Sequence, residues 1–287
     1  MEHKLWSQLY ELVMTTLYVD PARGVRHSDR WVVLTYLWAV VHDRATCWAT
    51  ERCNWPAGCG PVSLPTQPTM SRRLRSAPVR RLIYAALAHS RAAAPEVWVK
   101  HLDGKPLPVG GMSKDPDARD GYGAGGYFRG YKLHAIWGVG PVPLAWEVRP
   151  ANQSEPTIAR WLVRRLTGEG YLVGDSSYDS NPLYECAARR GHQVVAPPKK
   201  PQGAGTGHHR QSPIRLRGLE LLGHAFGQAL YKSRSAVERS FGHLTSFGGG
   251  LGPLPSWARR IHRVRLWVAA KLLINVARVS LPQRLVA

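Results

Sequence analysis

Cysteine is scarce in this 287-residue chain, which has four of them, at positions 47, 53, 59 and 186. So few thiols in so long a chain do not make a disulfide framework, and the spacing of the first three is not that of a zinc ribbon. Long apolar runs are also missing: the most apolar segment, residues 31–41, is shorter than the roughly 20 residues that a membrane-spanning helix needs. Because the first residues carry no signal-peptide pattern either, we expect a cytoplasmic protein with no membrane partner.

Acidic residues are the second shortage, with 19 Asp and Glu against 39 Lys and Arg and a formal net charge of +20. So many positive charges repel one another and destabilise the folded chain, unless a bound polyanion neutralises them. Nucleic acid is therefore the expected partner, and a membrane surface is the lesser alternative. Hydrophobic residues make up 44% of the chain, which excludes wholesale disorder.

The first 92 residues differ in pattern from the rest of the chain. They carry apolar residues at helical spacing, and Pro68 stands in the first turn of an expected helix. From residue 93 onward strand patterns and helix patterns alternate. We expect strands over 97–103, 131–137, 142–148, 171–175 and 193–196, helices over 157–166, 182–190, 225–244 and 261–279, and a basic loop over 198–218. The sequence thus predicts a helical domain at 1–92 and an α/β domain with a mixed sheet at 93–287.

Since acids are scarce, the positions of three of them are informative. Asp103 and Asp175 each end an apolar strand, and the carboxyl ends of neighbouring strands in an α/β sheet share one crevice. Glu238 lies at the edge of the apolar stripe of a long helix, one turn after Arg234. In a chain without zinc-type ligands, such carboxylate oxygens favour Mg²⁺ or Mn²⁺.

Each acid also has a purely structural interpretation. Asp103 before Gly104 fits a turn, and Asp175 before Ser176 fits the cap of a helix start. Asp179, four residues further, fits the cap of the helix that begins near residue 182. Taken singly, the first two acids favour the structural interpretation.

Five short motifs follow one another along the second part of the chain. They are Leu102-Asp103-Gly104-Lys105-Pro106, Gly130-Tyr131-Lys132-Leu133-His134, Pro150-Ala151-Asn152, Gly174-Asp175-Ser176-Ser177-Tyr178-Asp179-Ser180-Asn181 and Tyr231-x2-Arg234-x3-Glu238. In this order they resemble the DDE transposases of bacterial insertion sequences, over residues 96–280. That family often has Lys seven residues after the Glu, where this chain has Thr245.

The resemblance implies an RNase H-like domain and a DNA transposase, and it favours catalysis for the three acids taken together. By this resemblance Asp103, Asp175 and Glu238 are catalytic and bind two Mg²⁺ or Mn²⁺ ions. The implied reaction is cleavage at the ends of a DNA element, followed by transfer of the freed 3′-hydroxyl into target DNA. We also expect a homodimer on DNA and, in a bacterial cell, association with the nucleoid. A nuclease of the same fold that cuts without joining, and an inactive DNA-binding repressor, are the alternatives.

Basic residues in three places are candidate DNA contacts, with a solvated charged face as the structural alternative. The first place adjoins a plausible helix-turn-helix, which would enter the major groove. The second is the basic loop, which would contact phosphates. The third precedes the last acid, where Tyr231 is expected first to pack against the sheet and only second to contact DNA. The candidates are Arg72, Arg73 and Arg75, then Lys199, Lys200 and Arg210, then Tyr231 and Arg234.

Overall fold

The computed structural model describes residues 2–19, 25–92, 95–123, 125–199, 211–245 and 250–283. Contacts within the chain define two compact units, one of residues 94–242 and one of residues 1–93 together with 243–287. The first division falls where the sequence pattern changes. The second differs from the prediction that the α/β domain extends to residue 287, because the last helix packs with the first ones.

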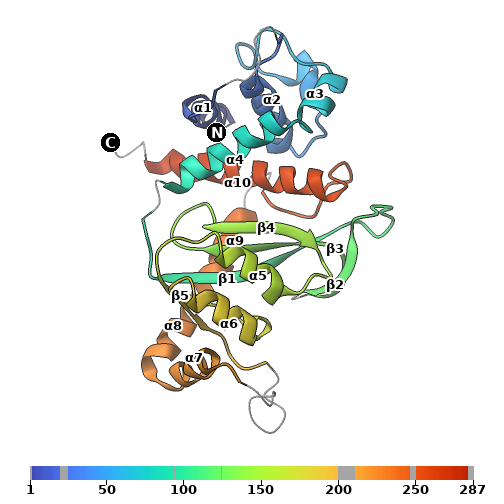
Figure 1. Cartoon of the computed structure of the whole chain (residues 1–287). Coiled ribbons are helices and arrows are strands. Elements are labelled where there is room, and N and C mark those ends of the chain that lie inside the picture. Colours follow the sequence, from blue (N-terminus) through green and yellow to red (C-terminus); the bar gives the residue numbers. More distant parts are fainter. Residues whose placement is uncertain are drawn as a thin grey trace. The chain divides into compact units, whose positions relative to one another are not determined.

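The unit of residues 94–242 is built on a six-stranded mixed sheet (Figure 1). Its strands are β1 (Val99–Pro108), β2 (Arg119–Gly123), β3 (Gly126–Trp137), β4 (Ala145–Pro150), β5 (Gly170–Val173) and β6 (His192–Val195). The order is β2–β3–β1–β5–β6, and β4 also pairs with β3. Strands β1 to β4 pair antiparallel, whereas β5 and β6 run parallel to β1. All five expected strands are present with shifted ends, and β2 is an additional one.

Helices cover both faces of this sheet. On one face α5 (Glu155–Val163) and α6 (Asn181–Ala188) pack against apolar residues such as Leu102 and Leu172. On the other face α8 (Ala225–Lys232) packs against Val173 and Val195. The preceding helix, α7 (Pro213–Gly223), contacts β6 and α6. Successive residues of a strand point to opposite faces, so the two buried clusters alternate along β5. Figure 1 shows α5 and α6 in front of the sheet and α9 (Ser235–Thr245) behind it.

The prediction of a turn at Gly104 is wrong, because β1 continues through it to Pro108. Gly104 pairs with His134 of β3 and lies beside the side chain of Lys132. A Cβ atom at this position would lie 2.9 Å from Cδ of Lys132, so the glycine makes room for a neighbouring side chain. The strand pattern was correct, and its end was misplaced.

The prediction of one helix over 225–244 is also wrong, since the helix breaks between α8 and α9. Ser233 donates its hydroxyl to the carbonyl of Leu230 (2.6 Å), and the backbone changes there to tighter i to i−3 hydrogen bonds. The apolar stripe continues across the break, so the periodicity alone does not show it. The expected loop over 198–218 is likewise shorter, because α7 begins at Pro213.

The other unit consists of helices. They are α1 (Glu2–Thr15), α2 (Asp29–Val41), the short η1 (Trp48–Thr50) and η2 (Arg52–Asn54), α3 (Gln67–Arg73), α4 (Ala77–Ala92) and α10 (Ile261–Gln283). The last helix packs against α1, α2 and α4. Its fully buried Lys271 donates to the carbonyl of Val40 (3.0 Å) and to the carboxylate of Asp43 (2.5 Å). Among the described residues, no helix is both long and apolar enough to span a membrane.

Candidate active site

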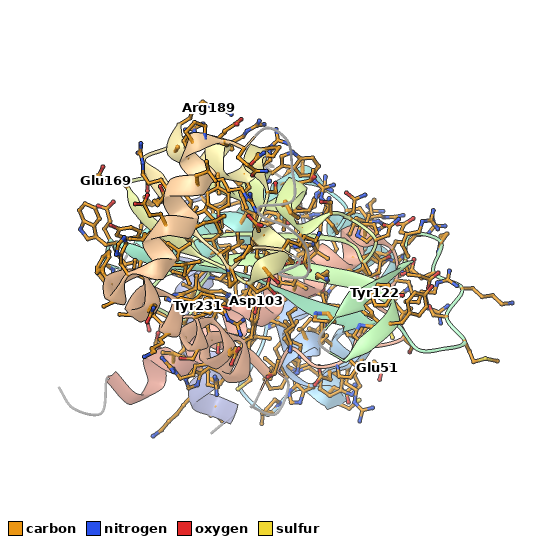
Figure 2. All side chains as sticks on the ribbon, turned by 90° about the horizontal axis from the view of Figure 1, so that it is seen from below. Glu51, Asp103, Tyr122, Glu169, Arg189 and Tyr231 are labelled. Atoms are coloured by element: carbon orange, nitrogen blue, oxygen red, sulfur yellow. The ribbon has the colours of Figure 1, made fainter. Side chains whose placement is uncertain are left out.

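Asp103 and Asp175 lie at the same place on neighbouring parallel strands. His101 of β1 and Val173 of β5 form the last pair of that parallel ladder, and each aspartate follows two residues later. The two strands are thus neighbours, which is the condition for their carboxyl ends to share one crevice. Asp103 itself lies inside β1, opposite Ala135 of β3. In Figure 2 it lies within the body of the molecule, with Tyr231 next to it in projection.

The electrostatic surroundings of Asp103 show that other charges are close. The pKa of Asp103 is raised to about 6, mainly by burial and in smaller part by the carboxylates of Asp175 and Glu155. Two neighbours act in the opposite direction: the backbone N–H of Gly104, which donates to the carboxylate at 2.7 Å, and the guanidinium of Arg234. Three carboxylates and one arginine therefore act on one another at this edge of the sheet.

Asp175 has a structural role as well as this position. Its Oδ1 accepts from the backbone N–H of Ser177 at 2.8 Å and caps the short helix η3 (Ser176–Tyr178), as the structural interpretation predicts. The hydroxyl of Ser177 lies within hydrogen-bond reach of both Asp175 and Glu155. A hydroxyl has one proton to donate, so it serves one carboxylate at a time. The cap fixes the backbone of Asp175 and leaves its second oxygen available.

Glu155, the first residue of α5, lies at the site, a role missed because its position in the sequence fits the start of the helix expected over 157–166. It forms an ion pair with Lys132 of β3, and the same ammonium donates to the carbonyl of Tyr122 at 2.8 Å. Lys132 thus balances one of the three negative charges. The sequence signal was weak, because the third motif ended at Asn152, three residues earlier.

Lys105 was also missed. It follows Asp103 by two residues and shares its face of β1. Burial lowers the pKa of Lys105, and the carboxylate of Asp103 partly offsets this effect. The site therefore has a lysine on the same strand as its most perturbed acid.

Glu238 lies on α9, which packs over the sheet face that carries His101 and Asp103. Phe241 of α9 contacts Trp137, the strand partner of His101, with ring centroids 5.7 Å apart. Nε2 of His101 and Oγ of Ser233, in the break before α9, are 2.8 Å apart. The third acid is therefore on the same side of the sheet as the first.

The carboxylate of Glu238 forms an ion pair with Arg234. Nη2 of Arg234 donates to Oε1 of Glu238 at 2.7 Å, and the side chain of Glu238 is 58% exposed. The same guanidinium lowers the pKa of Asp103, so it acts on both sides of the site. Within the described residues, no group of three His, Cys, Asp or Glu side chains is placed to hold a metal ion.

The candidate DNA contacts have different surroundings. Arg72 on α3 and Arg75 just after this helix are exposed, whereas Arg73 donates to the buried Asp29 at 2.5 Å and is engaged in the fold. Tyr231 is half-buried and packs against the cluster around Val173, which is the first of its two predicted roles. Of the remaining candidates, Lys199 is exposed. Lys200 and Arg210 lie outside the described residues.

The structure also differs from the prediction that Asp179 caps the helix near residue 182. Asp179 does not cap α6 but forms a buried ion pair with Arg215, through Nε to Oδ1 at 2.6 Å and Nη2 to Oδ2 at 2.7 Å. Arg215 is therefore a structural residue of α7. Oδ2 of Asp179 also accepts from the backbone N–H of Lys199 at 2.7 Å.

Residues 98–273 match the family model described as a transposase DDE domain, which is more than half of the chain. The chain belongs to this family. The match includes all three acids and the motifs around them, and it spans the sheet and most of α10. The RNase H-like fold predicted for this transposase is confirmed, with a mixed sheet flanked by helices and a helical N-terminal region. Comparisons with curated proteins and with solved structures found no match.

Proposed function

We propose that this transposase cuts DNA at the ends of its element and joins the freed 3′-hydroxyl to target DNA, with Asp103, Asp175 and Glu238 as catalytic residues. The observation that carries the proposal is the position of Arg234. It pairs with Glu238, and its guanidinium also lowers the pKa of Asp103, which supports a shared site for Glu238 and the two aspartates.

The two aspartates fit a hard divalent cation. Their like charges raise the cost of ionising Asp103 in a partly buried place, and carboxylate oxygens are the ligands that Mg²⁺ and Mn²⁺ prefer. Members of the family typically use divalent ions, and Asp103 and Asp175 would hold them here, with Glu238 completing the set. Such ions, when bound, supply charge stabilisation and an activated water for attack on a phosphodiester.

Glu238 can join the site because its ion pair is exposed. An exposed pair contributes about 1 kcal/mol or less, so a DNA phosphate can replace the carboxylate on the guanidinium of Arg234. The exchange leaves the carboxylate of Glu238 free to turn toward Asp103. Arg234 would then hold the DNA strand beside the acids.

DNA contacts outside the acids would come from basic residues. The exposed Arg72, Arg75 and Lys199 are candidates for phosphate contact, together with Lys200 and Arg210. A set of about 6–10 phosphate contacts would make binding fall by several powers of ten between low and moderate salt. Measuring affinity against salt tests this, and a flat profile contradicts it.

The central test uses full-length protein, Mg²⁺ and DNA that carries both ends of the element. We expect cutting and joined products with the wild type, and loss of both in Asp103→Asn and Asp175→Asn with DNA binding retained. Glu169→Gln, an exposed acid of the same unit, is the matched control. Undiminished cutting in either aspartate variant refutes the proposed site, and cutting without joining refutes the transfer step in favour of a nuclease.

We further propose that the protein acts as a homodimer on DNA. Two ends must be brought together for joining, and a pair of subunits can hold one end each. Sedimentation of the protein with end-containing DNA checks this. A complex with one subunit per pair of ends contradicts it.

A further inference from the structure

The helical unit contains a cavity that the proposed chemistry does not use. It has a volume of about 430 Å³ and is lined by α2, α3, the beginning of α4 and the beginning of α10, with the segment before α10. This volume lies within the range of small-ligand sites. All of its lining residues belong to the same unit, so the cavity is formed within one compact body.

The charge of this cavity is of one sign. Arg75, Arg80 and Arg263 line it together with His262, and no acidic residue is among the described residues that line it. Three guanidinium groups that line one cavity without a carboxylate among them repel one another, and an anion relieves the repulsion. Arginine binds phosphate through paired N–H donors, so phosphate is the anion that this arrangement fits best.

The cavity also has an apolar and aromatic part. Trp257 is half-buried in its wall, and Leu74, Leu266 and the buried Tyr36 lie there too. Burial raises the pKa of Tyr36, so its phenol remains a neutral hydrogen-bond donor. A tryptophan that lines a cavity beside arginines is a residue on which a nucleic-acid base can stack.

One face of α3 lines this cavity. Gln67 and Ser71 are four residues apart on α3, so they share a side of the helix, and both contribute to the wall. Arg75, two residues after the end of α3, contributes as well. Arg72 is exposed on α3 but is not part of the lining. The helix expected to enter the major groove thus also contributes residues to the wall of a cationic cavity.

We propose that this cavity binds a single nucleotide, with the phosphate on Arg75, Arg80 and Arg263 and the base against Trp257. The nucleotide is either a free nucleoside phosphate or one residue of a DNA strand that has left the duplex stack. The DNA source rests on the proposed function, but the binding does not require the chemistry of the acids in the other unit.

The experiment measures binding of the full-length protein to a labelled short single-stranded oligonucleotide by fluorescence anisotropy. Calorimetric titrations with deoxyadenosine monophosphate and with inorganic phosphate accompany it. The variants are Trp257→Ala and Arg80→Gln. Their matched controls are Trp98→Ala, an exposed tryptophan of the sheet unit, and Arg81→Gln, the exposed neighbour of Arg80 outside the cavity. Thermal melting followed by circular dichroism verifies the fold of each.

We expect both cavity variants to weaken oligonucleotide binding about ten-fold, and Trp257→Phe to restore most of it, because stacking needs an aromatic face. The two controls should bind as the wild type does. Pocket-dependent binding of the mononucleotide identifies a free nucleotide as a ligand, and binding of the oligonucleotide alone identifies DNA; both support the proposal.

Two results overturn it. One is weaker binding in Arg80→Gln with no effect of Trp257→Ala. The other is displacement of the oligonucleotide by polyglutamate as readily as by unlabelled DNA. The variants Asp103→Asn and Asp175→Asn separate this inference from the proposed function, since they should lose cutting and keep cavity-dependent binding. Wild-type protein that fails to cut but shows cavity-dependent binding contradicts the function alone.

Discussion

Two acid–arginine pairs of the sheet unit differ in one respect that decides their roles. Asp179 and Arg215 are joined by two hydrogen bonds, and their side chains are 2% and 3% exposed. Glu238 and Arg234 are joined at 2.7 Å, with side chains 58% and 29% exposed. In the sequence both pairs fall within residues 175–238, the segment from the second to the third acid. Each combines a carboxylate with a guanidinium.

The difference in burial separates a fixed pair from an exchangeable one. Removing one member of a buried pair leaves an uncompensated charge away from water and destabilises a protein by about 3–5 kcal/mol. Separating an exposed pair costs about 1 kcal/mol or less, because water solvates both charges. Asp179 therefore holds α7 in place, and Glu238 remains available for chemistry.

The sharpest way to test this contrast is Glu238→Gln. We expect DNA cutting to fall about a thousand-fold, because a carboxylate acting in the reaction is lost, while the free energy of unfolding changes by less than about 1 kcal/mol. Single-turnover cleavage and urea denaturation measure the two quantities. A large loss of stability would mean that the exposed pair is structural after all.

Asp179→Asn tests the other side of the contrast. It leaves Arg215 buried with a neutral partner, so we expect a loss of about 3–5 kcal/mol in the free energy of unfolding. Urea denaturation with the same fitted slope as the wild type is the measurement. Asp117→Asn, an acid away from this pair, serves as the control. A loss below about 1 kcal/mol would remove the distinction drawn from burial.

His134 extends the comparison to a buried group without a partner. Both of its ring nitrogens are buried and have no hydrogen-bond partner among the described residues. Burial, with Lys132 and Arg149 nearby, lowers the pKa of His134 to about 3. Because the pKa is depressed in the folded state, the neutral imidazole favours folding above pH 6.5, and this contribution is lost as the pH falls toward 3.

The measurement is the free energy of unfolding of the wild type and of His134→Leu between pH 7 and pH 4. The wild type should lose about 1.4 kcal/mol per pH unit more than the variant in the lower part of this range. Parallel curves would show that His134 does not titrate on unfolding.

Glu155→Gln probes a pair of intermediate burial, with Lys132. We expect cutting to fall about ten-fold, because the Glu155 carboxylate links Ser177 to Lys132, and its loss leaves the side chains beside Asp175 less firmly positioned. The concentration of Mg²⁺ needed for half-maximal cutting should rise as well. Glu169→Gln should leave both values unchanged, and equal effects in the two variants would contradict a positioning role for Glu155.

Much of the site followed from the sequence because it depends on local patterns. Apolar alternation located β1 and β5, and their parallel pairing brought Asp103 and Asp175 to one edge as expected. The helical stripe around Val237 also predicted a helix packed on the sheet, with Glu238 at its rim. These features need no knowledge of distant residues, since a strand or helix pattern is written in consecutive positions.

Other features depended on residues far apart in the chain. The pairing of Asp179 with Arg215, the ion pair of Lys132 with Glu155 and the assignment of the last helix to the helical unit had no local signal. The break at Ser233 is of the same kind, because His101, which contacts its hydroxyl, comes from β1.

The sequence by itself determined the family, the mixed sheet and the cationic character of the chain, and it singled out three acids as candidates for the site. The tertiary structure decided which charges are buried, and with that which of them hold the fold and which can act. The physical reason is that an ionised side chain has the same chemistry everywhere, whereas the cost of breaking its ion pair depends on how much water surrounds it.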